Sequence, residues 1–217
     1  MSPSKLRQVA RRVAVEQEEA ETERCELCGD VIPPQHRHML DLQSRELMCS
    51  CQACRILFDS GAAGGGHYRL VPDRRLRLVD FEMDDVAWEE LRIPVDMAFF
   101  FHRTDAGRVV AYYPSPAGPT ESLLELDAWQ QLERANPVLQ ELTPDVEALL
   151  VNRSRGARQY FLVSVEDCYA LVGLIRTRWR GLTGGREVWE EIEAFFEGLT
   201  ARSKEAHSER EEATWQT

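Results

Sequence analysis

The chain has 217 residues, which suits one ordinary domain with an appendage or two small domains. With 43% hydrophobic and 29% charged residues, its composition is that of a globular protein and excludes a wholly disordered chain. The formal net charge of −11 argues against nucleic acid as the main partner, because phosphate binding needs a basic surface that releases counterions.

Neither a membrane span nor a secretory signal is predicted. The longest apolar runs, such as PVDMAFFF and YALVGLI, are much shorter than the roughly 20 residues that cross a bilayer. The N-terminal segment lacks an apolar stretch followed by a small-residue cleavage site. We therefore expect a cytoplasmic protein, in which closely spaced cysteines bind metal more often than they form disulfides.

The first predicted element is a helix within residues 1–23. Its basic residues stand at the N-terminal end and its acidic residues at the C-terminal end. This order opposes the helix dipole, so we expect a helix that is weakly stable alone and that frays or docks on another surface.

The segment from Cys25 to Cys54 contains five of the six cysteines and two of the five histidines. Two C-x-x-C pairs, Cys25/Cys28 and Cys51/Cys54, each place two thiolates on one turn, and Gly29 follows the first pair where the chain must turn back. Between the pairs, HRHMLDL and RELMCS predict two short strands that return the second pair to the first. We predict a zinc-ribbon or treble-clef-like module over residues 24–60, with these four cysteines as the zinc ligands.

Iron is the competing metal, as a rubredoxin-like centre or an iron–sulfur cluster. The second pair, CQACR, lacks the glycine that follows the first, and the spacings match neither common ferredoxin pattern. Four thiolates leave no coordination position for water or substrate, so we expect a structural site. Metal binding on the order of 10 kcal/mol would fold a small module that presents a surface to a partner.

Three further potential ligands lie in this segment: Cys49, His36 and His38. On an extended chain, Cys49 shares a face with Cys51, and His36 shares a face with His38. Cys49 could replace Cys51 as a ligand, support the ligands by hydrogen bonding or fill core space, and we favour the last two. His38 could complete an alternative set of three cysteines and one histidine, but we expect it to pack or hydrogen-bond near the site.

Residues 61–66, GAAGGG, predict a hinge, since the run lacks the lysine and hydroxyl of a phosphate-binding loop. Residues 67–200 predict an α+β domain, an antiparallel sheet covered by helices. The polar residues 201–217 predict a disordered tail.

Within this domain, HYRLV and LRLVDF have strand patterns, and DDVAWEEL predicts a short helix capped by Asp84 or Asp85. PVDMAFFF and RVVAYY predict a hairpin around RTDAGR. Because both are apolar at nearly every position, we expect central strands covered on two faces.

The turn-rich stretch PSPAGPTES leads to a predicted helix, LLELDAWQQLERA, that ends at Asn136-Pro137. VEALLVNR and ARQYFLVSV predict a second hairpin, although Thr143-Pro144 is also a good helix start. Two amphipathic helices follow, the first with Ser164 and Asp167 in a capping-box pattern. Their apolar stripes comprise Cys168, Leu171, Val172, Ile175 and Trp179 in the first, and Val188, Ile192, Phe195, Phe196 and Leu199 in the second.

No nucleotide-binding, protease or hydrolase fingerprint is present in the sequence, and His102 has no identifiable nucleophile to serve. Two groups of arginines could form a basic patch for a partner that carries carboxylates or phosphates. Surface salt bridges with the many glutamates are the alternative. The groups are Arg153, Arg155 and Arg158 around a turn, and Arg176, Arg178 and Arg180 on either side of Trp179.

Several phrases resemble a bacterial family whose genes recur beside those for subunits and maturation factors of uptake [NiFe] hydrogenases. They are CELCG, HRHMLDL, CSCQAC, YYPSPAGPTES, VEALLVNR, DCYALVGLIRTRWRGL and GGREVWEE, so the resemblance extends from about Arg24 to Leu199. It implies an accessory role in assembling, stabilising or delivering metal to the hydrogenase. Zinc ribbons also occur in nickel-delivery maturation proteins, but this chain does not match their sequence pattern.

We therefore expect a non-enzymatic accessory protein that docks on a hydrogenase subunit or maturation factor. The second hypothesis is an iron-containing electron carrier that uses the same four cysteines. The third is an enzyme with a pocket between the two hairpins, using His102 or the arginines, although no residue set specifies a reaction.

Overall fold

The computed structural model describes residues 23–59, 65–181 and 183–207. The chain divides into two compact units, residues 1–71 and 72–217. The predicted N-terminal helix, except for Glu23, lies outside the described residues, as do residues 61–64 of the predicted hinge and residues 208–217 of the predicted tail.

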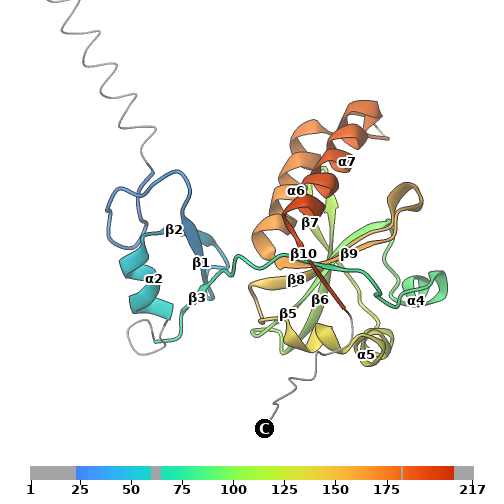
Figure 1. The fold of residues 1–217 in the computed structure, drawn as a ribbon, viewed down its shortest axis with the longest axis horizontal. Coiled ribbons are helices and arrows are strands. Elements are labelled where there is room, and N and C mark those ends of the chain that lie inside the picture. The colour runs from blue at the N-terminus through green and yellow to red at the C-terminus, as the bar shows by residue number, and fades with distance from the viewer. Residues whose placement is uncertain (1–22, 60–64, 182, 208–217) are drawn as a thin grey trace, which may run out of the picture. The chain divides into compact units, whose positions relative to one another are not determined.

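The described part of the first unit contains a three-stranded antiparallel sheet of order β2-β1-β3 and the helix α2 (Figure 1). Its elements are β1 (Arg37–Asp41), β2 (Leu47–Ser50), α2 (Gln52–Asp59) and β3 (Tyr68–Leu70). The hairpin β1–β2 is the one that HRHMLDL and RELMCS predict. Strand β3 was assigned by its sequence to the following domain, but it pairs with β1, with Met39 opposite Leu70.

The second unit is built on a seven-stranded sheet of order β10-β4-β9-β8-β5-β6-β7. All neighbours are antiparallel except β10 and β4. The strands are β4 (Leu76–Leu78), β5 (Met97–Arg103), β6 (Arg108–Ser115), β7 (Gly118–Ser122), β8 (Glu147–Asn152), β9 (Gln159–Ser164) and β10 (Lys204–Ala206). The predicted α+β class is confirmed, as are the hairpins β5–β6 and β8–β9.

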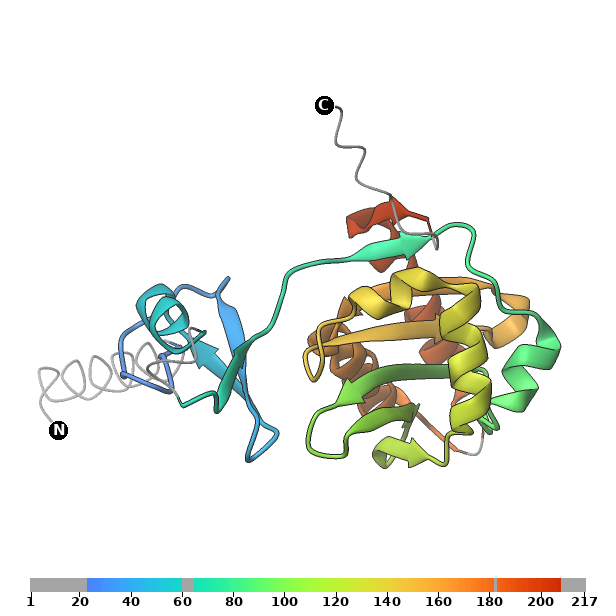
Figure 2. The ribbon, with the colours of Figure 1, turned by 90° about the horizontal axis from the view of Figure 1, so that it is seen from below.

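Helices cover both faces of this sheet, as the continuous apolar runs of its central strands predict (Figures 1 and 2). On one face Phe100 packs with Trp129 of α5 (Leu126–Ala135) and Trp88 of α4 (Asp85–Glu90). On the other, Phe161 packs against Phe196 of α7 (Gly185–Arg202), and α6 (Val165–Arg178) lies beside α7. Short 3-10 helices span Pro137–Glu141 and Ser154–Gly156.

Asp84 caps α4 as predicted, because its Oδ1 accepts a hydrogen bond from the Ala87 N–H at 2.7 Å. The capping box predicted for α6 does not form: the Ser164 side chain makes no cap bond, and Asp167 pairs with Arg75 at 2.9 Å. A full positive charge attracts this carboxylate more strongly than a backbone N–H does. Burial nevertheless raises the pKa of Asp167 above its usual value.

Two other segments differ from their sequence-based predictions. The turn-rich PSPAGPTES forms the end of β6, the tight turn and the whole of β7, and in this turn the Ser115 hydroxyl donates to Gly118 O at 2.9 Å. Residues 201–206, predicted as part of a disordered tail, end α7 and form β10, where Lys204 lies opposite Leu76. A polar edge strand gives no amphipathic signal, since its stability comes from its partner strand.

The turn before α7 provides a matched pair of glycine substitutions. Gly184 and Gly185 both have positive φ, of 81° and 78°. A Cβ on Gly184 would lie 2.7 Å from Val188 Cγ1 and 2.9 Å from Trp179 Cε3, whereas a Cβ on Gly185 would meet nothing within 4 Å. We expect G185A to cost about 1 kcal/mol of backbone strain and G184A to cost a further 1–3 kcal/mol for the clash.

Urea unfolding followed by tryptophan fluorescence measures this difference, since all five tryptophans belong to the second unit. Equal midpoints for the two variants would contradict the close packing of Gly184 against Trp179 and Val188.

Candidate metal centre

The first cysteine pair lies on a tight turn closed by backbone hydrogen bonds. Gly29 N donates to Cys25 O and Cys25 N donates to Asp30 O, both at 2.8 Å. Gly29 has a φ of 79°, a conformation that glycine adopts without steric cost, so its place after the pair follows from the geometry of the turn.

The second pair begins a helix. Cys51 immediately precedes α2, and the Cys54 N–H donates to Cys51 Sγ at 3.4 Å. The sulfur therefore occupies the place of a capping oxygen at the helix N-terminus.

The sulfurs of Cys25, Cys28, Cys51 and Cys54 lie within 4.8 Å of one another, and those of Cys28 and Cys51 are 3.7 Å apart. Four thiolates at about 2.3 Å from a tetrahedral ion would stand about 3.8 Å apart. Because the observed spacing approaches this value, the cluster is able to hold one metal ion. Cys25 and Cys54 are buried, whereas Cys28 is exposed at the edge.

The environment of the cluster distinguishes its sulfurs. Burial alone would raise the pKa of Cys25, but N–H groups of Cys51, Cys28 and Leu27 donate to its sulfur and bring the pKa down to about 6. Burial and the three neighbouring sulfurs raise the pKa of Cys54 well above its usual value. Four thiolates this close repel one another, and a dication would compensate their charge.

Glu26 fastens the first turn to the sheet. Its N–H donates to Cys49 O at 2.9 Å, and its Oε2 accepts from Cys49 N at 2.5 Å. This reciprocal pair holds β2 beside the first cysteine pair. This role of Glu26 was not predicted, and its place inside the first C-x-x-C pair is the only signal for it in the local sequence.

The remaining potential ligands form a cluster of their own. His36, His38 and Cys49 bring one donor atom each to within 4.8 Å of one another. The two imidazole rings are 4.7 Å apart, and His38 lies opposite Cys49 in the register of β1 and β2. Cys51, rather than Cys49, lies with the other three cysteines.

The arginines named as partner-binding residues belong to different surroundings. Arg153 is buried, lies over the Trp88 ring at 5.5 Å and forms an ion pair with Asp85. Arg158 also reaches Asp85, at 2.6 Å. These two arginines hold α4 to the turn that precedes β9, so Arg153 is not on the surface.

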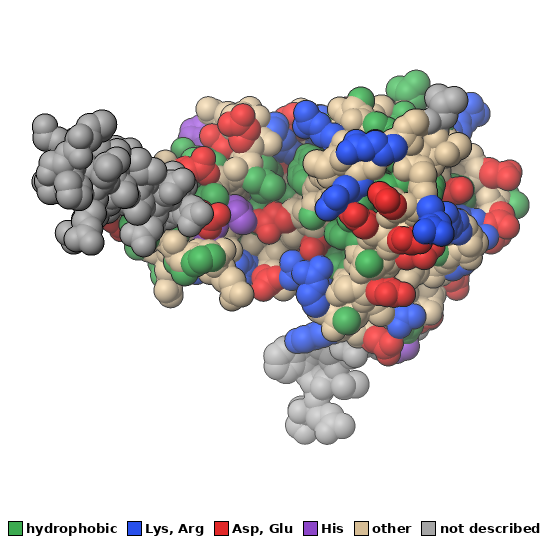
Figure 3. Space-filling model, turned by 90° about the horizontal axis from the view of Figure 1, so that it is seen from above, with side chains coloured by type: hydrophobic (Ala, Val, Ile, Leu, Met, Phe, Trp, Pro, Cys, Tyr) green, Lys and Arg blue, Asp and Glu red, His purple; other side chains and the backbone are tan. Residues whose placement is uncertain are grey.

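The other arginines lie at the α6–α7 end of the second unit. Arg155 contacts Glu193 at 3.0 Å and lies over the Trp189 ring at 5.0 Å. Arg178, in the last turn of α6, contacts Glu191 at 3.2 Å, and Arg176 is exposed in the same turn. Arg180 donates to Trp179 O at 3.4 Å. On the face of the second unit that Figure 3 shows, basic and acidic side chains are interspersed.

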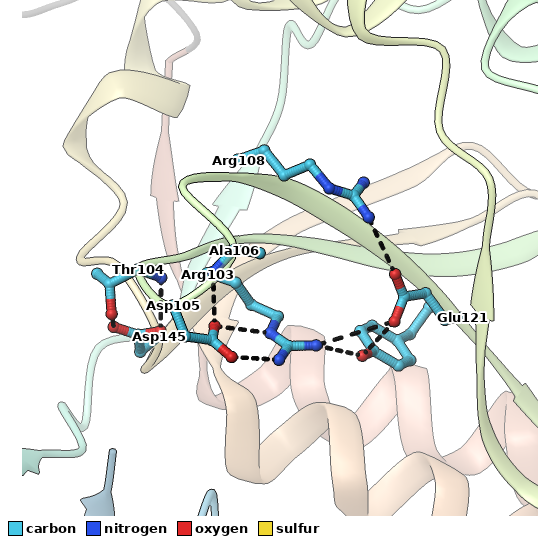
Figure 4. A network of polar contacts seen from close by, with 8 residues as sticks. Arg103, Thr104, Asp105, Ala106, Arg108, Glu121 and Asp145 are labelled. Carbon is cyan, nitrogen blue, oxygen red and sulfur yellow. Dashed lines mark hydrogen bonds and ion pairs between the residues drawn. The ribbon is translucent and has the colours of Figure 1, made fainter. Parts of the chain in front are cut away.

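The region around His102 is a structural junction. Next to it, Arg103 donates to Asp105 and to the Tyr112 hydroxyl, which in turn donates to Glu121 at 2.9 Å (Figure 4). Asp145 accepts hydrogen bonds from the backbone and hydroxyl of Thr104 at 3.0 and 2.7 Å. These contacts join the β5–β6 turn to β7 and to the start of β8.

Residues 24–203 match the model of a family described as a family of unknown function (DUF5947), and the chain belongs to this family. No functionally curated protein matches the chain, and no protein of solved structure does. None of the helices within the described ranges combines the length and the apolar character that crossing a bilayer requires.

Replacing one clustered cysteine should affect the first unit alone. We expect C28S to bind less metal than the wild type and to make residues 23–71 sensitive to protease, because few other side chains in the described part of this unit are buried. Tryptophan fluorescence should stay unchanged, because every tryptophan is in the second unit. Metal analysis and limited proteolysis measure both effects.

Cys168 provides the control, since it is fully buried in α6 and belongs to the second unit. C168A should keep the metal content of the wild type. Full metal retention in C28S would contradict a site built from the four cysteines.

Proposed function

We propose that this member of the DUF5947 family is a non-enzymatic accessory protein for the assembly, stabilisation or maturation of a [NiFe] hydrogenase in the cytoplasm. The four cysteines hold a structural zinc ion, and the first unit presents a surface to a hydrogenase subunit or maturation factor. The observation that carries this proposal is the convergence of four sulfurs, which would complete the coordination of a tetrahedral ion and exclude substrate from it.

The choice of zinc rests on the donor set and on its setting. Four thiolates suit zinc, which has no preferred geometry of its own and accepts the tetrahedron that the fold provides. The hydrophobic cluster around the cysteines is small, with Cys25, Ile32 and Cys54 as its buried members. A metal ion that links its two cysteine pairs would supply stability that such a core does not.

An iron-containing electron carrier is the second candidate, because Cys28 is exposed. A solvent-facing sulfur ligand would bring the metal close to the surface, where an electron could pass to a docked partner. The four sulfurs would be the same in both functions.

Exposed apolar side chains support a docking role for the first unit. Ile56 on α2 is 69% exposed, and Val31, beside the first cysteine turn, is 58% exposed. A metal-stabilised module that leaves such side chains in solvent has surface available for a partner. The choice of a hydrogenase component as that partner comes from the sequence resemblance.

The identity of the metal separates the two candidates. Protein purified without oxygen should contain zinc and show no visible absorption, because zinc has a filled d shell. Elemental analysis together with a visible spectrum measures this. Stoichiometric iron with thiolate charge-transfer bands would replace the zinc proposal with the electron carrier.

The partner is tested by affinity capture with the tagged full-length protein from cells that express the hydrogenase. We expect hydrogenase subunits or maturation factors to be enriched, and I56D to reduce their recovery at least tenfold without loss of metal, since a buried carboxylate destabilises an interface.

Val86 provides the matched control, because it is 61% exposed on α4 of the second unit. V86D should leave the recovery unchanged. If no hydrogenase component is enriched with the wild type, the accessory role is wrong.

A further inference from the structure

His36, His38 and Cys49 converge at a place that the four-cysteine site does not use. Their donor atoms lie within 4.8 Å of one another, the three residues are partly buried, and the His36 side chain is only 6% exposed. Two imidazoles and a thiolate are ligands that late first-row cations prefer. The question is whether the fold merely packs these side chains together or arranges them as ligands.

The pairing of β1 and β2 explains the convergence. His38 and Cys49 are directly opposite each other in this antiparallel pair, so their side chains leave the sheet on the same face. His36 precedes His38 by two residues and therefore lies on that face as well. The reciprocal hydrogen bonds between Glu26 and Cys49 fix this part of β2, so one member of the cluster is held by the backbone.

The hydrogen bonds of His36 determine which of its nitrogens can bind a cation. Its Nδ1 lies 3.0 Å from Pro33 O and 3.2 Å from Glu23 Oε2. Neither a carbonyl nor a carboxylate oxygen has a hydrogen to donate, so Nδ1 carries the proton. In the neutral ring, Nε2 then has the lone pair. This atom is buried and makes no hydrogen bond to any residue that the structure describes.

This is the arrangement of a metal-binding histidine. Such a residue donates its other ring N–H to a carbonyl or carboxylate, which fixes the tautomer and orients the lone pair toward the metal. A histidine that only packs against its neighbours needs no such fixed orientation. Pro33 and Glu23 supply both kinds of acceptor to one nitrogen.

We propose that His36, His38 and Cys49 form a second metal site, which binds Zn²⁺ or a similar late first-row dication separately from the four cysteines. Ordinary Zn–N and Zn–S lengths put such donors roughly 3.3–3.7 Å apart, which small side-chain rotations would reach. Three protein ligands leave one tetrahedral position for water or a group from a partner. Unlike the four-cysteine site, this one is open and suits an exchangeable ion.

The full-length chain, freed of metal under reducing conditions, is titrated with Zn²⁺ against a chromogenic chelator. We expect two equivalents in the wild type and one in both H38A and C49S. With Co²⁺ as the probe, both variants should keep the absorption of the four-thiolate site, which shows that the first unit still folds. E23A should weaken the second equivalent about 10- to 100-fold, because it removes an acceptor for the His36 N–H.

His67 provides the control, because it belongs to the same unit and its ring pairs with Gln43 at 3.0 Å instead. H67A should bind two equivalents. The second site is wrong if the wild type binds one equivalent or if H38A and C49S still bind two. Loss of both equivalents in H38A and C49S would also overturn it, since these residues would then serve the first site. None of these outcomes depends on the hydrogenase proposal.

Discussion

The fold of the first unit depends on the convergence of four cysteine sulfurs, because the other buried side chains in its described part form only a small core. The two pairs are separated by more than twenty residues, and their approach closes that loop at an entropic cost. Near the cluster, Cys25, Ile32 and Cys54 are buried, and Met39, Leu40 and Val71 are buried elsewhere in the described part of this unit. An ion that binds all four sulfurs would offset the loop entropy at the point where the core is smallest.

The second unit has a large apolar core instead. Its sheet is apolar on both faces, and Phe99, Phe100 and Phe161 are fully buried. Some of the charged groups inside it form ion pairs, as Arg153 does with Asp85 and Asp167 does with Arg75. Burial on this scale stabilises a domain of this size by itself. Removing metal should therefore affect only the first unit, and this separation allows the tryptophans to serve as an internal reference.

Local signals predicted much of this structure. The cysteine pairs, the turn at Gly29, the hairpin β1–β2 and the two hairpins of the large sheet each depend on residues close in sequence. The predictions that were wrong concern contacts between residues far apart in the sequence. Strand β3 was recognised as a strand, but its partner β1 lies nearly thirty residues earlier and nothing in its pattern specifies that choice. Likewise, Asp167 forms an ion pair with Arg75, which is far away in the sequence, and the predicted capping box is not formed.

The same distinction applies to the candidate sites. The four cysteines could be predicted because C-x-x-C spacing carries its own geometry. From the sequence, His36, His38 and Cys49 could be named as possible ligands, but their proximity could not be predicted. Only the register of β1 on β2 places His38 opposite Cys49. A shift by one residue would send Cys49 to the other face of the sheet. That register follows from the whole unit, so the second cluster is a property of the fold and not of a motif.

Because the second site depends on the fold of the unit, we expect the two proposed sites to bind metal in a fixed order. Cys51 belongs to the first site and lies two residues after Cys49, on the same short segment of chain. A metal bound to Cys51 would also hold the end of β2 in place. Cys49 is held in addition by its hydrogen bond to Glu26, which lies inside the first cysteine pair. Metal binding at the second site would not position the four cysteines in the same way, because His36 and His38 lie on β1 or just before it. The closed site should therefore fill first and hold the unit folded, while the open site gains and loses its ion on a framework that is already set.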